Sequence, residues 1–494
     1  MEKKITIIGA GIAGLSAGCY GRMNGYDTEI FEMHNVPGGV CTGWVRKGYT
    51  FDGCLHWLTG SAPGSPYHQI WEELGALKGK KTINHEAFCH IVTASGTRLI
   101  QYGDLDRLTD ELKRIGPEDS AQIDRIRADA RRFGTLRMPI SAPKGVLNRL
   151  KGLTGILLYL PLFRRYGGMS VEKLAASFKN PALQDFFSMV VRLPDFPALW
   201  VLGLLSMLDK KEAGWPEGGS LAFARSIESR YMGLGGKIHY SARVEEILVE
   251  NDHAVGVRLA DGSEHRADVI ISAADGHATL FTMLRGRYIS KRMKKLYETL
   301  PLYTPLVQVS FGVKRDMAGE PRLTRYGFQT PLHFGEAEIP SLSLNNYGFD
   351  PSMAPPGRSV LTITFQSPYD RWEKLHQDRE RYREEKKRVE GDAVRWLESV
   401  YPGIGADIEV ADVATPMTTV RYTGNWHASF EGWRPISDTM RVKLEKTLPG
   451  LKGFSMIGQW TSPMAGLPTV AQDGRVAIEL LCREDQKPFI TTKP

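Results

Sequence analysis

Cysteine is scarce in this sequence, and no two cysteines form a C-x-x-C pair. The 494 residues include five, at positions 19, 41, 54, 89 and 482. A small, odd number of cysteines argues against a disulfide framework and for a reducing compartment. No run approaches the roughly 20 apolar residues that span a bilayer, and the opening MEKKITIIGAG has no signal-peptide pattern. We therefore expect a cytoplasmic protein, soluble or bound peripherally to the inner face of the membrane.

Nucleic-acid motifs are absent as well. The formal charge is +7, and an excess of this size could favour an anionic membrane, a nucleic acid or an anionic cofactor. Because the sequence has no zinc finger, RNA-binding motif or arginine-rich arm, we expect no nucleic-acid partner. The length suits two or three domains, and 42% apolar with 24% charged residues is ordinary for a globular chain.

The clearest motif is a glycine turn near the N-terminus. A buried strand (KITII), the turn Gly9-x-Gly11-x-x-Gly14 and a helix follow one another, and Glu32 ends the next strand. Such a turn brings backbone N–H groups and a helix N-terminus against a pyrophosphate, while the acid accepts hydrogen bonds from a ribose. The segment predicts a dinucleotide site, and the charge of the acid disfavours the 2′-phosphate of NADP.

A metal site is the competing interpretation of the stretch that follows. His34, Cys41, Cys54 and His56 lie close together in the sequence, but their spacing matches no zinc pattern. We expect no metal. The same stretch carries a Gly-Gly pair, which fits a backbone that passes close to a diphosphate or a flavin ring.

Three stretches together resemble one enzyme family. They are IIGAGIAGLSAG…IFEMHNVPGGVCTGW…YTFDGCLHWLTG (7–60), VEEILVENDHAVGVRLADGSEHRADVIISAADGH (244–277) and MIGQWTSPMAGLPTVAQDGRVAIELL (456–481). These resemble the flavin-dependent desaturases, saturases and isomerases of isoprenoids, the group of phytoene desaturase, carotenoid isomerase and retinol saturase. Val40 departs from the arginine of many relatives, and Asp473 stands where a serine is frequent. The resemblance implies FAD as cofactor and a hydrophobic small molecule as substrate.

The fold that this pattern implies is α/β. We expect a doubly wound Rossmann-type FAD-binding domain, discontinuous along the chain, with an inserted α+β substrate domain and a helical lid. Residues 1–75, 215–285 and 440–494 are assigned to the FAD-binding domain. The substrate-binding domain takes residues 76–214 and 286–439.

The expected cofactor contacts come from the glycine turn, the stretch after Glu32 and the two later motifs. The closing motif predicts a helix whose N-terminus, near residues 468–470, stabilises the negative charge of a reduced flavin. The predicted cofactor-binding residues are Gly9, Gly11, Ile12, Ala13, Gly14, Glu32, Met33, Gly38, Gly39, Val40, His56, Trp57, Val244, Ala273, Gly458, Gly466, Leu467, Pro468, Thr469 and Val470.

The substrate side needs few polar groups, because in hydride transfer between a carbon and a flavin the cofactor performs the hard step. His56 is our candidate catalytic residue, although a core histidine bonded to backbone fits the sequence equally well. Trp460 either packs in the core or lines the substrate cavity. Tyr422 and His427 fit a loop over that cavity or a plain surface loop.

Three further segments carry expectations. Residues 144–166 form an apolar helical stripe with basic residues off it, too short to span a bilayer. Such a segment either lies in the interface of an anionic membrane or packs as a lid on the protein's own core. Residues 196–208 predict a buried helix or a wall for a hydrocarbon, and residues 370–400 predict one long charged helix.

The leading hypothesis is an FAD-dependent oxidoreductase that desaturates or saturates carbon–carbon bonds of an isoprenoid or polyene. Three alternatives stay open: a flavin-dependent cis/trans isomerase without net redox change, an amine oxidase, and a non-enzymatic escort of lipids on the same scaffold. No second nucleotide site is visible, which leaves oxygen, a quinone or another protein as the electron partner. The sequence does not choose the substrate, the reaction direction or the oligomeric state.

Overall fold

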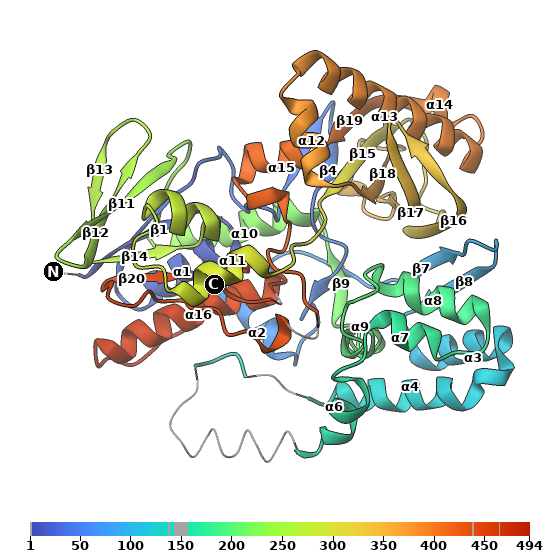
Figure 1. Cartoon of the computed structure of the whole chain (residues 1–494), viewed down its shortest axis with the longest axis horizontal. Coiled ribbons are helices and arrows are strands. Elements are labelled where there is room, and N and C mark those ends of the chain that lie inside the picture. Colours follow the sequence, from blue (N-terminus) through green and yellow to red (C-terminus); the bar gives the residue numbers. More distant parts are fainter. Residues whose placement is uncertain (1, 137–138, 143–156, 437–438, 464) are drawn as a thin grey trace.

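The structure is a computed structural model that describes residues 2–136, 139–142, 157–436, 439–463 and 465–494. The glycine turn belongs to a five-stranded parallel sheet (Figure 1), whose strands come from distant parts of the chain. In spatial order they are β10 (Lys237–His239), β2 (Asp27–Phe31), β1 (Lys4–Ile8), β14 (Val269–Ser272) and β20 (Phe454–Met456). The central strand is β-branched and almost wholly buried, as a strand covered on both faces requires.

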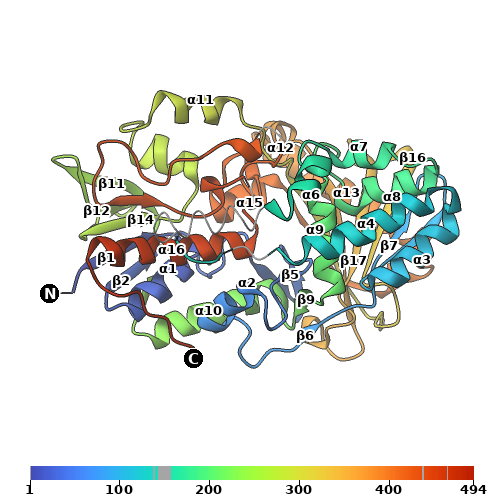
Figure 2. The ribbon, with the colours of Figure 1, turned by 90° about the horizontal axis from the view of Figure 1, so that it is seen from below.

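Helices α1 (Ile12–Met23), α10 (Gly219–Gly233) and α16 (Leu467–Glu484) pack around this sheet. Figure 2 shows α1 and α16 side by side, and the hydroxyl of Ser16 donates to the carbonyl of Ala471 at 2.6 Å. A Cβ at Gly474 would lie 2.6 Å from the carbonyl oxygen of Ala13, so this approach needs a glycine. Two helices that begin 455 positions apart (12 and 467) therefore start close to one another.

A small antiparallel sheet borders the parallel one (Figure 1, far left). It is formed by β11 (Val244–Glu250), β12 (His253–Leu259) and β13 (Glu264–Arg266). Gly262 takes a φ of +86° in the turn between the last two strands, where other residues would be strained.

The second large unit is built on a seven-stranded mixed sheet (Figure 1, upper right). Its spatial order is β19 (Ile408–Ala414), β15 (Leu306–Val313), β18 (Ser359–Gln366), β17 (Ala337–Asn346), β16 (Leu323–Phe334), β7 (Ala87–Val92) and β8 (Arg98–Tyr102). One face is apolar and is covered by α12 (Tyr369–His376) and α13 (Arg379–Val400).

The prediction of a single helix over residues 370–400 is wrong, because the structure has two helices there. Helix α12 ends at His376 and α13 begins at Arg379. Between them the side chain of Asp378 accepts hydrogen bonds from the N–H groups of Glu380 and Arg381. An aspartate in this position caps a new helix N-terminus. Both helices contribute buried side chains to the apolar cluster on this face of the sheet.

Further helices gather near β7 and β8 (Figure 1, lower right). Their buried side chains join those of β7 and β8 in one apolar cluster. These helices are α3 (Leu105–Ile115), α4 (Ser120–Phe133), α6 (Leu160–Tyr166), α7 (Val171–Ala176), α8 (Pro181–Val191) and α9 (Leu199–Asp209). The α9 segment, predicted within residues 196–208, is a buried helix.

The remaining strands and α-helices are short. They are β3 (Gly43–Arg46), β4 (Tyr49–Asp52), β5 (Leu58–Thr59), α2 (Pro66–Glu73), β6 (Thr82–Ile83), β9 (Ala213–Pro216), α11 (Lys291–Thr299), α14 (Ile404–Asp407) and α15 (Pro416–Thr423). The predicted α/β fold class, with a discontinuous parallel-sheet unit and an inserted α+β unit, is confirmed. The domain boundaries stay a prediction.

The predicted membrane segment, residues 144–166, falls partly outside the described residues, which resume at Leu157. The first two described side chains of this segment are exposed, with Leu157 at 64% and Leu158 at 66%. Across the described parts of the chain, no helix combines the length and the hydropathy needed to cross a membrane.

Candidate functional site

A cavity of about 670 Å³ opens at the carboxyl ends of the parallel strands. Strands β1, β2 and β14 end at it, and so does the loop after β20. The carboxyl edge is where open parallel sheets bind their ligands, and the volume is in the range of cofactor sites. The fold therefore places this cavity where the glycine turn predicts a dinucleotide.

The N-terminus of α1 faces this cavity without a capping side chain. Gly11 is the N-cap residue and supplies no side-chain cap. A Cβ at Gly14 would lie 2.0 Å from the carbonyl oxygen of Gly9, whereas a Cβ at Gly11 would meet nothing nearer than the Gly38 oxygen, at 3.9 Å. Gly14 thus allows the helix to pack closely against the turn, whereas Gly11 leaves open space beside the backbone. The free N–H groups and the positive end of the helix suit a phosphate.

Glu32 lies at the end of β2 and is buried. Its carboxylate accepts hydrogen bonds from the backbone N–H groups of Ala10, at 2.7 Å, and His34, at 2.8 Å. Burial raises the pKa of this carboxyl group, and these backbone bonds oppose the rise. The carboxylate oxygens, each with further acceptor capacity, are positioned for the hydroxyl groups of a ribose.

The Gly38-Gly39 pair passes directly beside the turn. The N–H of Gly38 donates to the carbonyl of Ala10 at 2.9 Å, and Gly38 pairs with Gly11 in an isolated bridge. A Cβ at Gly38, whose φ is +109°, would lie 2.1 Å from the oxygen of Cys41. Only glycine permits this backbone path, which closes one side of the cavity.

The N-terminus of α16 faces the same cavity. Its N-cap residue, Gly466, supplies no side-chain cap. Within the helix, the carboxylate of Asp473 accepts hydrogen bonds from the hydroxyl of Thr461, at 2.7 Å, and the N–H of Gly458, at 3.3 Å, and it pairs with Lys446. Asp473, a departure from the family pattern, thus fixes the loop that follows β20 against the helix.

Most predicted cofactor residues line the cavity. Those that do are Gly9, Gly11, Ile12, Ala13, Glu32, Met33, Gly38, Gly39, Val40, Val244, Ala273, Gly458, Gly466, Leu467 and Val470. Those that are not among its lining residues are Gly14, His56, Trp57, Pro468 and Thr469.

Sequence reasoning missed several lining residues that carry charge or hydrogen-bonding groups. Asp275 lies in the quoted SAADGH stretch, so the motif could have identified it. Glu245, Glu246, Arg258 and Gln459 also lie in the quoted motif stretches, whereas Arg243, Arg285, Asn425 and Glu431 come from segments that only the fold brings to the cavity.

Across the described residues, no cluster of three His, Cys, Asp or Glu side chains could hold an ion. The thiol of Cys41 is buried and bonds the carbonyl of Ser220, and its pKa is raised by the neighbouring Cys54 and by burial. A thiol held in the protonated state is a poor ligand.

His56 lies beyond the cavity, in the chain segment that leads from β4 to β5. The carboxylate of Asp52 holds this segment, because it accepts the N–H groups of Cys54 and Leu55 and both the N–H and the hydroxyl of Ser220. Burial, and then three nearby arginines, lower the pKa of His56 to about 4. The ring is therefore neutral at neutral pH.

The other predicted substrate residues differ in environment. Trp460 is 3% exposed and packs among Tyr297, Trp426 and Trp433, with ring centroids 5.2 to 6.3 Å away. Tyr422 is 40% exposed and meets the ring of His34 edge-on. His427 stacks on Tyr369. None of these three residues is among those that line the cavity. Trp57, predicted to bind the cofactor, meets Phe88 edge-on and does not line the cavity either.

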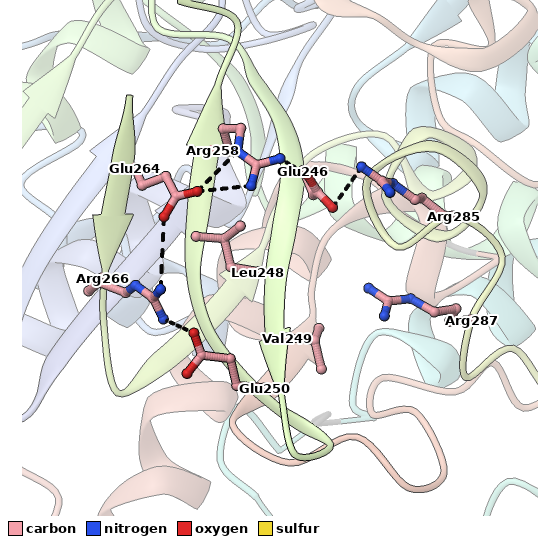
Figure 3. A pocket seen from close by; sticks show the side chains of 9 residues that line it. All are labelled: Glu246, Leu248, Val249, Glu250, Arg258, Glu264, Arg266, Arg285 and Arg287. Carbon is pink, nitrogen blue, oxygen red and sulfur yellow. Dashed lines mark hydrogen bonds and ion pairs between the residues drawn. The ribbon is translucent and has the colours of Figure 1, made fainter. Parts of the chain in front are cut away.

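A second, shallower groove of about 410 Å³ lies on the small antiparallel sheet (Figure 3). Arg258 pairs with Glu246 and Glu264, Arg266 pairs with Glu250 and Glu264, and Arg285 pairs with Glu246. The charges of this groove largely neutralise one another.

Comparison with known proteins agrees with this geometry. The profile of the family described as flavin containing amine oxidoreductase matches residues 12–468. The chain is 24% identical over 509 residues to the chloroplastic prolycopene isomerase of Daucus carota, which covers 97% of this chain and 80% of that protein. It is 25% identical over 525 residues to the zeta-carotene-forming phytoene desaturase of Myxococcus xanthus, covering 97% and 94%.

Solved structures show the same architecture. An oxidoreductase from Methanosarcina mazei superposes with a TM-score of 0.61 at 19% identity, over 96% of this chain and 100% of that one. Putrescine oxidase bound to putrescine gives a TM-score of 0.62 at 15% identity, over 98% and 100%. At these identities the structural likeness shows the fold alone. Because the family profile spans nearly the whole chain, the protein belongs to the flavin containing amine oxidoreductase family.

Proposed function

We propose that the chain binds FAD and uses it to desaturate or saturate carbon–carbon bonds of a hydrophobic isoprenoid or polyene. The observation that carries the proposal is the convergence of two uncapped helix N-termini, those of α1 and α16, on one cavity with Glu32 at its edge. The relatives named as phytoene desaturases support the reaction class.

The residues present fit FAD. The α1 N-terminus and Gly11 would hold the pyrophosphate, and Glu32 the ribose of the adenosine half. The N-terminus of α16 would hold the pyrimidine edge of the flavin, where negative charge grows on reduction. Bound FAD supplies hydride acceptance or donation at the flavin ring. Around it the apolar side chains of Val40, Leu467 and Val470 exclude water.

A cis/trans isomerase without net redox change is the second candidate. It is supported by the relatives named as prolycopene isomerases, which are 24% to 26% identical to this chain. An amine oxidase is less well supported, because three arginines near His56 would repel a cationic amine. A pure escort role does not explain two uncapped helix N-termini at one cavity.

The first experiment is the visible absorption spectrum of the purified protein. A flavin spectrum, or its appearance after incubation with FAD, is expected, and failure of both would overturn the proposal. Anaerobic mixing with polyenes then separates the reactions. A desaturase bleaches its flavin, and a saturase with reduced flavin restores the colour. An isomerase changes geometry with the number of double bonds unchanged. Oxygen and a quinone, supplied separately, identify the electron acceptor.

We further propose peripheral contact of residues 144–166 with an anionic membrane. Support comes from the exposed Leu157, Leu158 and Phe163, which are followed by Arg164; apolar and basic side chains together favour such an interface. Flotation with anionic and neutral vesicles tests it. Binding to anionic vesicles that is lost in a Leu157→Glu, Leu158→Glu variant is expected. If wild type and variant both stay in the fraction without vesicles to the same extent, the membrane contact is contradicted.

A further inference from the structure

Three arginines lie together where the end of α8 meets strands β16 and β17. Arg192 directly follows α8, Arg322 directly precedes β16, and Arg325 lies within β16. Arg322 and Arg325 are each 8% exposed, and Arg192 is half-buried. Three cations in one buried region repel one another, and each loses hydration.

The hydrogen bonds of these guanidinium groups all go to neutral acceptors. Arg322 donates to the carbonyl of His56 at 2.7 Å. Arg325 donates to the carbonyl of Met189 at 2.7 Å, at the end of α8. Arg192 donates to the hydroxyl of Ser343 at 2.7 Å. These bonds orient the side chains and leave their charge uncompensated.

No carboxylate pairs with any of the three within the described part of the chain, in contrast to the charged groove of Figure 3. In addition, the Nε atom of each of Arg192, Arg322 and Arg325 is buried and has no hydrogen-bond partner among the described residues. Phe88 lies under Arg322, with its ring centroid 4.9 Å from Cζ, which favours a cation without neutralising it. The described residues therefore supply no anion to this cluster.

The sheet face around Arg325 is also polar. Ser343 pairs with Arg325 across β17 and β16, and Asn345 pairs with Thr362 across β17 and β18. Paired residues in antiparallel strands point to the same face. Asn345 is 3% exposed, yet its side-chain Nδ2 has no partner among the described residues. A face meant only for packing would not leave such groups unpaired.

This region adjoins the cofactor cavity. Arg322 bonds the backbone of His56, two residues after the cavity-lining Cys54. Farther along the same sheet face, the amide of Gln308 donates to the carbonyl of Asp52 at 2.8 Å. His56 as a residue is half-buried, and the three arginines are close enough to its ring to lower its pKa. The arginines therefore lie beside the chain segment that continues from the cavity-lining Cys54.

We propose that Arg192, Arg322 and Arg325 bind the anionic end of the substrate, a carboxylate or a phosphate ester carried on an apolar chain. Guanidinium groups match both anions through paired N–H donors. The inference rests on the proposed function only in taking this ligand as the substrate of the flavin site. It deepens that proposal, because a neutral hydrocarbon would leave all three charges without a partner.

The test measures binding to the purified flavin-loaded protein by calorimetry, with no turnover. The probes share one farnesyl chain and differ at its end: farnesoic acid, farnesyl monophosphate and farnesol, with inorganic phosphate as the headgroup alone. We expect at least one anionic probe to bind tenfold or more tightly than the alcohol. Preference for the acid identifies a carboxylate substrate, and preference for the monophosphate identifies a phosphate ester. Equal binding of all three farnesyl probes would overturn the inference.

Variants localise the effect. Arg192→Gln should remove the preference for the anion and leave the affinity for farnesol unchanged, and Arg192→Lys should keep part of it. The matched control is Arg315→Gln in the same sheet unit, because Arg315 already pairs with Asp407. An undiminished preference in Arg192→Gln and in a second variant, Arg322→Lys, would refute the site. If a variant fails to fold, the wild-type comparison of acid and alcohol still decides.

The flavin spectrum of the same samples separates the two proposals. Anion binding by a protein that takes up no flavin would overturn the proposed function and keep this site. If the flavin bleaches with neutral polyenes and the anionic probes bind no more tightly than farnesol, the proposed function is kept and the anion site is overturned.

Discussion

Replacement of Gly11 by alanine separates cofactor binding from folding. The backbone of Gly11 has φ −67° and ψ 173°, a conformation that alanine adopts without strain. The new methyl group would meet no protein atom nearer than 3.9 Å. At an N-cap, this exchange should lower the free energy of unfolding by no more than about 1 kcal/mol.

The methyl group would instead occupy the space assigned to the pyrophosphate. Displacement of the phosphate by one methyl group removes at least one charge-assisted hydrogen bond, worth about 1.5–3 kcal/mol. The dissociation constant for FAD should therefore rise about 10- to 150-fold. Titration of the flavin-free protein with FAD, followed by quenching of flavin fluorescence, measures this change.

Two other glycines serve as comparisons. Gly14→Ala places a Cβ 2.0 Å from the Gly9 oxygen, so it should lower both stability, by about 1–3 kcal/mol, and affinity. Gly233→Ala, at the end of α10 with no atom within 4 Å, should keep full affinity and gain about 0.5–1 kcal/mol of stability. Wild-type affinity in Gly11→Ala would refute the placement of the pyrophosphate beside this residue.

Three further predictions concern buried polar groups. Asp473→Ala should lower the free energy of unfolding by about 1–3 kcal/mol in urea titrations, because Thr461 and Lys446 lose their partner. The control Lys446→Met keeps the bond between Thr461 and Asp473 and should lower the free energy of unfolding by less. Equal losses in the two variants would contradict this account. Because burial and the arginines lower the pKa of His56 to about 4, His56→Gln should leave the profile of kcat/KM unchanged between about pH 6 and 8. An inflection in that window that disappears on substitution would argue against a neutral ring. Burial raises the pKa of Asp275 from 3.8 to about 6, so its contribution to stability is full below about pH 4 and declines by about 3 kcal/mol as the pH rises through 6. Urea unfolding at several pH values should show a weaker decline in Asp275→Asn, and an identical slope would count against the assignment.

The cofactor side of the site could be predicted largely from local sequence. Gly9, Gly11 and Glu32 act through a turn, a helix end and a strand end, all within one short strand–turn–helix–strand unit. The contacts of such a unit are close in sequence, so spacing alone specifies them. The closing motif predicted a helix start near residues 468–470, and α16 begins at Leu467, slightly earlier.

The substrate side could not be predicted in this manner. The sequence left Trp460 between a core and a cavity position, and the fold packs it among Tyr297 and Trp433. His56 was proposed beside the flavin, but the fold places it with the arginines, outside the residues that line the cofactor cavity. Its role stays a prediction. The environments of Trp460 and His56 do not follow from a periodic sequence pattern, because each depends on side chains that are distant in the sequence and become neighbours only in the fold.

By itself the sequence determined the α/β class and the dinucleotide-type turn, since these follow from hydrophobic periodicity and glycine spacing over a few tens of residues. The resemblance of three motif stretches indicated the family. The tertiary structure decided which charges are compensated. Arg192 and Arg322 are 130 positions apart, and they approach one another only because α8 ends against β16 and β17. The net charge of +7 gave no sign of this cluster, since a sum over the chain does not record where an arginine lacks a carboxylate.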